Sequence, residues 1–399
     1  MKFTSPLFIA AMIASPASAE MDYSTLFKDQ GPAGAINTLS RIENPSPSDR
    51  FALGGAHFLG ALEGALQRRY AYGLVSNDFA DAVEIPFLRL PITANPTPKP
   101  FAAEAVELLF EDVLTDLSRA KASLDQITNT DSVAVDIRID DLWLDINRNR
   151  LRDEGEGLLT ITGGMLSAPD DAPLPTIRFD TADAAWLAAY SQVLSGMSAL
   201  ILSTNLTEAI EGTFTGAAEI DGLRVTQGPL LGWFEDDELA MLDAFTAFIL
   251  ALEGQPDANR TKAAHAHFLA AIDDNYRFWE RVAIETDDTM EFIPNDTQSS
   301  ALGVDFPQGI GDSWLEVLRD AERVLNGDLL LPHWRLGNTA GLNLKQLLQD
   351  PPNIDIIGLF QGYPLAPYAQ KGPVITTDSL ERFDEITAGN SPFFAIMLN

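Results

Sequence analysis

The chain has 399 residues, of which 46% are hydrophobic, and it carries 26 Lys and Arg against 58 Asp and Glu, a formal net charge of −32. That apolar fraction is typical of a globular protein with a sizeable core. The charge disfavours nucleic acid as a partner, because phosphate binding needs clustered Lys and Arg, and it leaves protein, neutral or cationic ligands. With no Cys, disulfides, thiolate nucleophiles, iron–sulfur clusters and Cys-ligated zinc are excluded.

Residues 1–19 have the pattern of a secretory signal peptide. Lys2 gives a positive start, Leu7–Ile13 is a short apolar run, and residues 17–19 form an Ala-Ser-Ala cleavage site. The run is too short to cross a bilayer, and no later stretch reaches the length that a spanning helix needs. We therefore expect cleavage after Ala19, a periplasmic or secreted product and no transmembrane segment. Loss of Lys2 leaves 25 basic and 58 acidic residues, a net charge of −33.

Helical periodicity dominates the mature chain. Helices over 23–42 and 49–72, separated by a Pro- and Ser-rich break, predict a helical hairpin. The second carries Gly54, Gly55, Gly60 and Gly64, which would allow a neighbouring helix to approach closely. Further amphipathic helices are predicted over 101–127, from 183, and near 237–252, 264–283 and 313–325, the last with Ser313 and Glu316 at capping-box spacing.

A change of period interrupts these helices. Val133, Val135, Ile137 and Ile139 alternate with polar residues, which predicts a half-buried strand. A second short strand is expected around 158–162, so that the two strands form a β-hairpin with a polar loop between them. The predicted fold is therefore mainly α, with an N-terminal helical region over 20–130, an inserted β-hairpin over 131–180, and a C-terminal helical region over 181–399 packed with the first.

The polar loop carries a motif with a defined chemistry. Residues 145–156 read D-I-N-R-N-R-L-R-D-E-G-E, which puts oxygen-bearing side chains at positions 1, 3, 5, 9 and 12 and a free carbonyl at position 7. Ca²⁺ takes six to eight oxygen ligands, so this spacing lets one loop surround the ion while the last Glu closes it with both oxygens. The loop is predicted to hold Ca²⁺ as a structural brace rather than as a signal.

This segment resembles the EF-hand-like calcium loops of bacterial secreted proteins, over residues 145–156 only. Two positions depart from that pattern: Arg150 stands where Gly normally makes the sharp turn, and Arg152 where an apolar residue normally packs. The alternative interpretation is a solvated turn whose Asn and Asp residues simply favour turn conformations. The resemblance implies as ligands Asp145, Asn147, Asn149, the carbonyl of Leu151, Asp153 directly or through water, and Glu156.

Acidic residues beside aromatic ones suggest a different function. A glycoside hydrolase holds its sugar between two carboxyl groups, and such groups are available near Trp279 and Phe292. The candidates are Glu280, Glu285, Asp287, Asp288 and Glu291.

Later segments add little chemistry. His333, Trp334 and Arg335 are expected in a packed loop rather than a pocket. Parts of residues 178–370 are similar to exported bacterial proteins of unknown function. We therefore expect an exported calcium-binding helical protein with a binding or interaction role in the periplasm. A carboxylate-dependent hydrolase of carbohydrate or cell-wall substrate is the alternative, and its catalytic residues are unknown.

Overall fold

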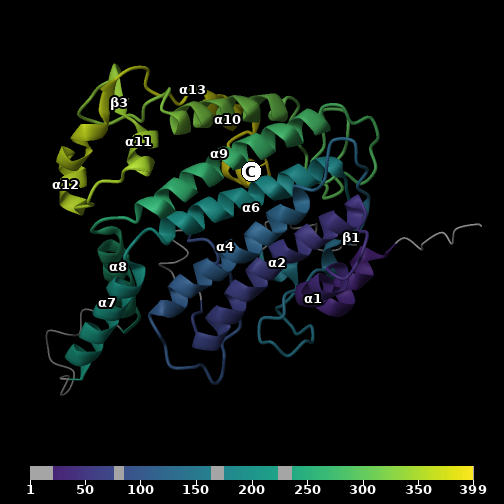
Figure 1. The fold of residues 1–399 in the computed structure, drawn as a ribbon, viewed down its shortest axis with the longest axis horizontal. Helices are drawn as coiled ribbons and strands as arrows, with labels where there is room; N and C mark the ends of the chain where they lie inside the picture. The colour runs from purple at the N-terminus through teal and green to yellow at the C-terminus, as the bar shows by residue number, and fades with distance from the viewer. Residues whose placement is uncertain (1–20, 76–84, 163–174, 223–235, 399) are drawn as a thin grey trace, which may run out of the picture.

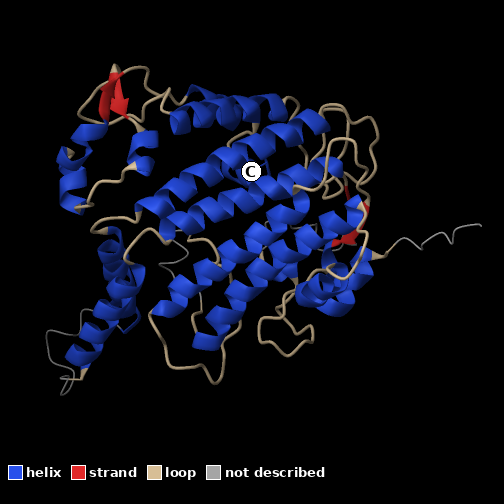
Figure 2. Ribbon diagram, in the orientation of Figure 1, coloured by secondary structure: helices blue, strands red, loops and turns tan. Residues whose placement is uncertain are grey.

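The computed structural model describes residues 21–75, 85–162, 175–222 and 236–398. The fold is mainly α-helical, as predicted, with two small two-stranded sheets near opposite ends of the molecule (Figure 2). The expected signal peptide lies outside the described residues.

Three long helices build the N-terminal part: α1 (Tyr23–Leu39), α2 (Pro47–Tyr72) and α4 (Glu104–Leu124) (Figure 1). The hairpin of α1 and α2 is confirmed, and α2 also packs along α4. Helix α2 begins sharply, because the side chains and backbone N–H groups of Ser46 and Asp49 cap each other. Helix α1 is kinked at Gly31 and Pro32, where Gly31 has a φ of 61°.

The inserted strands pair differently from the prediction. Strand β1 (Val135–Arg138) is antiparallel to β2 (Thr176–Phe179), whereas residues 158–162 were expected to be its partner. That apolar segment instead forms the helical turn α5 (Leu158–Ile161), since a short apolar run fits either structure. The polar loop therefore does not form the tip of the hairpin. It connects a short 3₁₀ turn, η1 (Ile139–Asp141), to α5.

The C-terminal part is layered on α6 (Thr181–Ile201). Helix α9 (Ala258–Val282) packs along α6, and α10 (Ile310–Asn326) lies on α9 (Figure 1). The predicted start of α10 was wrong: the helix begins three residues before Ser313, whose buried hydroxyl caps nothing. A pair of helices that contact each other, α7 (Leu206–Asp221) and α8 (Asp236–Leu252), projects from the body.

Short elements complete the chain. Strands β3 and β4 form the second sheet, and small helices cover the neighbouring edge of the molecule. Trp334, expected to be packed, is instead 68% exposed. The elements are β3 (Ala340–Leu342), α11 (Leu344–Gln349), α12 (Ile356–Gln361), the 3₁₀ turn η2 (Tyr363–Tyr368), β4 (Ala369–Lys371), α13 (Asp378–Ile386) and α14 (Ser391–Leu398).

Among the described residues, three clusters of buried apolar side chains make up the core, and α6 contacts all of them. Within the described chain, α6 is also the helix whose length and hydropathy would suit a membrane span, but 56% of that window is buried inside the protein. Burial against the other helices accounts for its apolar sequence.

Candidate functional site

The ends of the predicted calcium loop are joined by backbone pairing. Leu144 N donates to Glu156 O at 2.9 Å and Leu158 N to Leu142 O at 3.0 Å, on either side of a bridge between Trp143 and Gly157. The twelve residues are therefore closed into a ring before any side chain contributes.

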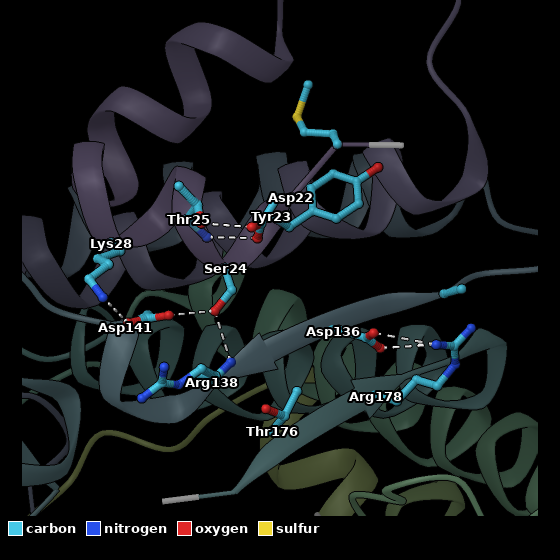
Figure 3. Close-up of a pocket in the computed structure, with 12 residues that line it drawn as sticks. Asp22, Tyr23, Ser24, Thr25, Lys28, Asp136, Arg138, Asp141, Thr176 and Arg178 are labelled. Atoms are coloured by element: carbon cyan, nitrogen blue, oxygen red, sulfur yellow. Dashed lines mark hydrogen bonds and ion pairs between the residues drawn. The ribbon is translucent and has the colours of Figure 1, made fainter. Parts of the chain in front are cut away.

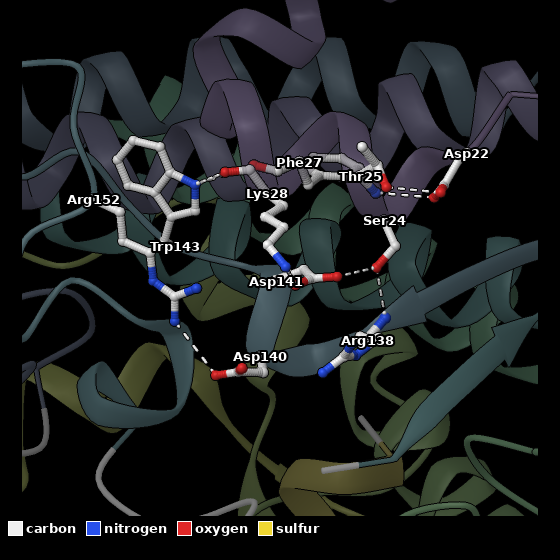
Figure 4. A network of polar contacts seen from close by, with 10 residues as sticks. All are labelled: Asp22, Ser24, Thr25, Phe27, Lys28, Arg138, Asp140, Asp141, Trp143 and Arg152. Atoms are coloured by element: carbon white, nitrogen blue, oxygen red, sulfur yellow. Dashed lines mark hydrogen bonds and ion pairs between the residues drawn. The ribbon is translucent and has the colours of Figure 1, made fainter. Parts of the chain in front are cut away.

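Trp143 fastens this ring to α1. Its indole nitrogen donates to the carbonyls of Phe27 at 3.1 Å and Lys28 at 3.0 Å (Figure 4). The Lys28 carbonyl is available because Pro32, four residues later, has no N–H to donate. The carbonyl that the kink leaves without a helical partner therefore accepts the hydrogen bond that attaches the loop.

The backbone of the loop turns in the way that a calcium loop requires. Arg148 and Arg150 have φ values of 64° and 63°, so position 6 makes the left-handed turn normally given to Gly. Three side chains stabilise this path. Asp145 Oδ2 accepts from Arg150 N at 3.0 Å, Asn147 Oδ1 from Asn149 N at 2.9 Å, and Asn149 Oδ1 from Leu151 N at 2.7 Å.

The last two predicted ligands also point into the ring. Glu156 is buried, and its Oε1 and Oε2 accept at 2.9 Å from Ile146 N and Asp153 N. Burial raises the pKa of Glu156. Asp153 Oδ2 accepts from the amide nitrogens of both Asn147 and Asn149 at 2.6 Å. The structure therefore brings five predicted side chains together, whereas the side chain of Leu151, predicted to act through its carbonyl, is exposed.

Two residues of α2 complete the site, and sequence reasoning missed both. Glu63 Oε2 accepts from Asp145 N at 2.9 Å, while Gln67 donates to Asp145 O at 2.7 Å and accepts from Arg148 Nε at 2.9 Å. Burial, together with the nearby carboxylate of Asp145, raises the pKa of Glu63 to about 7. The sequence offered one indication of these residues: Glu63 stands among small and apolar residues, one helical turn before Gln67.

Two arginines of the loop bind residues outside it. Arg152 pairs with Asp140 at 3.4 Å (Figure 4), and Arg148 bonds to Gln67. Within the described residues, none of the three loop arginines forms an ion pair with Asp145, Asp153 or Glu156.

A second group of carboxylates lies beyond the loop. Oxygens of Asp180, Glu285 and Glu291 lie within 4.8 Å of one another, a spacing that the loop carboxylates do not meet. Glu285 and Glu291 belong to the five acids considered for a hydrolase, but Asp180 comes from the N-terminal cap of α6.

Carboxyl groups in and beside this second group have raised pKa values. Burial first, then Asp180 beside it, raises the pKa of Glu285 to about 8. Burial also raises the pKa of Glu291, and that of Asp183 well above its usual range. Burial and the neighbouring like charges therefore favour the protonated forms of Glu285, Glu291 and Asp183.

The described residues also line a polar cleft and an apolar cleft. A polar cleft of about 560 Å³ lies between the first turn of α1 and strands β1 and β2, where Asp136 pairs with Arg178 (Figure 3). An apolar cleft of about 310 Å³ lies among α6, α9, α10 and α11. Neither is lined by the loop or by the second group of carboxylates.

Comparison of the chain with protein-family models, curated proteins and solved structures finds no match.

Proposed function

We propose that residues 145–156 bind Ca²⁺ and that the bound ion braces the connection between β1 and α5 against α1 and α2. The observation that carries the proposal is the backbone path, with left-handed turns at Arg148 and Arg150 and the side chains of positions 1, 3 and 5 already folded over it. A bound ion would supply positive charge to a ring of oxygens with which the loop arginines form no ion pair in the described chain.

The residues present fit a hard cation. Their side chains offer carboxylate and amide oxygens, which Ca²⁺ prefers. Asp145 Oδ1 is buried and has no hydrogen-bond partner among the described residues, so it can accept an ion without losing a contact. The residues that would hold it are Asp145, Asn147, Asn149, the carbonyl of Leu151, Asp153 and Glu156.

Binding requires side chains to rotate. The amide nitrogens of Asn147 and Asn149 now donate to Asp153, so these side chains must turn to offer oxygen to the ion. Their oxygens then give up the bonds from Asn149 N and Leu151 N, whereas the backbone bridge that closes the ring involves neither side chain and can stay as it is. The loss of conformational entropy on ordering a loop usually opposes binding. Here most of that loss takes place on folding rather than on binding.

The proposed cellular role depends on the expected signal peptide. An exported protein meets abundant calcium, so the ion would be a constant part of the fold rather than a signal. We propose that the braced protein acts through binding and interaction.

The hydrolase alternative has weaker support. Glycoside hydrolases keep their two carboxyl groups about 5 to 9.5 Å apart around the sugar. Asp180 and Glu285 are instead hydrogen-bonded to each other, and neither lines the two clefts described above. Two carboxyl groups in direct contact leave no room for a sugar between them.

Calcium titration with thermal melting tests the proposal. A ligand that binds only the folded state at one hundred times its dissociation constant stabilises by about 2.7 kcal/mol, so the melting temperature should rise by several degrees. Asp145→Asn keeps an oxygen that can accept from Arg150 N but removes the charge, and should abolish the rise.

Asp140→Asn is the matched control. Asp140 is an acid that pairs with Arg152 outside the ring, so this variant should keep the calcium-dependent rise. An unchanged melting temperature in millimolar Ca²⁺, or equal rises in wild type and Asp145→Asn, would contradict the proposal.

A further inference from the structure

Most of the exposed large apolar side chains in the described chain lie at one end of the molecule. Of eighteen such residues in the described chain, ten lie in two patches. Six are on α7 and α8, and four are around α12, at the same end of the longest axis (Figure 1). Apolar patches of this kind mark interaction surfaces.

The first patch is the acidic hairpin, by which we mean α7 and α8. The two helices contain eight Asp and Glu and no Lys or Arg. Met241 and Leu242 are each 51% exposed, and Phe245 lies one turn farther along the same side of α8. The hairpin thus combines an apolar stripe with acidic residues and no basic ones.

The second patch is the aromatic corner, which consists of Trp334, Ile357, Phe360 and Tyr363. Ile357 and Phe360 are each 81% exposed. The guanidinium of Arg335 lies 4.2 Å from the ring centre of Trp334, and the ring of Phe360 lies 6.5 Å from it. Aromatic residues and Arg in such groups dominate the binding energy of protein interfaces.

The corner holds one charged residue of each sign. Arg335 lies over the ring of Trp334, and Asp355 is bonded to Tyr363 and to Ile357 N. Arg335 forms no ion pair within the described part of the chain. Its guanidinium is therefore available to a carboxylate of a partner.

Backbone pairing connects the chain segments that carry the two patches. Gly254 N donates to Ile354 O at 2.9 Å and Ile354 N to Gly254 O at 2.6 Å, which ties the residues after α8 to those before α12. Each molecule therefore presents both patches at one end.

We propose that two copies of this chain form a symmetric dimer in which the aromatic corner of each packs on the acidic hairpin of the other. A twofold axis makes the two contacts identical, because each protomer supplies one patch of each kind. Apolar side chains would meet at the centre, with Arg335 facing the hairpin carboxylates at the rim.

A lipid surface suits the corner less well. Asp355 lies within it and accepts from the Tyr363 hydroxyl and from Ile357 N, both at 3.1 Å. Burial of this carboxylate in acyl chains is costly, and anionic headgroups repel a chain of this charge.

Sedimentation equilibrium of the mature chain tests the dimer. Wild type should have twice the mass of one chain, and Ile357→Gln with Phe360→Gln, or Met241→Gln with Leu242→Gln, should raise the dissociation constant at least about tenfold. Ile284→Gln, at a 77% exposed residue outside both patches, should leave it unchanged. Circular dichroism should show equal helix content in all variants.

Mixing the two double variants gives the sharper result. Their mixed dimer keeps one intact contact, between the unmodified hairpin of one and the unmodified corner of the other, whereas each variant alone keeps none. Mixing should therefore restore dimers. A monomeric wild type, equal dimerisation of all variants, failure of mixing to restore dimers, or binding of the monomer to phosphatidylcholine vesicles through the corner would overturn the proposal.

Discussion

Carboxylates at the two acidic sites of this protein differ in their neighbours. Glu63 and Glu156 accept backbone N–H groups of the loop. Asp180, Asp183 and Glu291 also accept backbone N–H groups, but they lie near one another and near Glu285, with Arg281 as the nearby cation and Gln298 as a further hydrogen-bond donor. Burial and the like charge raise the pKa values of Asp183, Glu285 and Glu291, so these groups hold protons that isolated acids would lose.

Retained protons make stability depend on pH. The pKa of Glu285 rises from an ordinary 4.5 to about 8 in the folded protein. The folded state therefore binds more protons than the unfolded chain between these values, and the free energy of unfolding falls as pH rises from about 4.5 to about 8. Glu285→Gln should flatten this fall and make the variant more stable than wild type at pH 8.5. Urea unfolding across a pH series measures both.

Glu280→Gln provides the control for this prediction. Glu280 is an exposed acid near the end of α9, so its substitution should leave the pH profile of wild type unchanged. A profile for Glu285→Gln as steep as that of wild type would show that its carboxyl does not hold the extra proton.

Single elements differ in how well local sequence specifies them. Long amphipathic helices such as α4 follow from the spacing of their apolar residues. The segment 158–162 was misassigned because four or five apolar residues fit a strand or a helical turn equally well. Ser313 matches a capping pattern, but the helix had already begun at Ile310.

The candidate site was predictable to the same extent. The loop ligands are consecutive in sequence, so their spacing could be recognised. The contribution of Glu63 and the pairing of Asp180 with Glu285 could not be recognised in this way. These residues are far from their partners in the chain, and only the packing of the folded protein brings them together.

The glycines of α2 allow a matched test at the scale of one helix. A Cβ on Gly54 would lie 2.7 Å from Leu124 of α4, which is buried, whereas a Cβ on Gly64 would meet nothing within 4 Å. Gly54→Ala should therefore destabilise by about 1–3 kcal/mol through overpacking. Gly64→Ala should stabilise by up to about 1 kcal/mol, because Ala favours the helix.

Urea unfolding of both variants measures these opposite effects within one helix. Gly54→Ala combined with Leu124→Ala should be less destabilised than the sum of the two single changes, because the contact is removed. Equal effects of the two glycine substitutions would mean that α2 does not approach α4 as closely as the structure has it.

At the scale of the whole molecule, α6 makes separate cores depend on one another. Leu187 and Ala188 belong to the N-terminal core cluster, and Ala182 and Ala185 to the C-terminal one. Trp186 packs against both. Neither cluster can lose its packing without exposing one face of the same helix, so the protein should unfold as a single cooperative unit.

Fluorine NMR can measure this cooperativity at two defined positions. In protein labelled with 5-fluorotryptophan, Trp143 reports on the loop and its contact with α1, and Trp314 on the C-terminal core. Substitution of each by Phe assigns its resonance. Both folded signals should disappear at the same temperature. If the loop binds Ca²⁺, both should also move upward by the same amount, because the ion stabilises the only folded state that is populated. A rise at Trp143 alone would mean that the loop and the C-terminal core unfold separately, whether or not the ion binds.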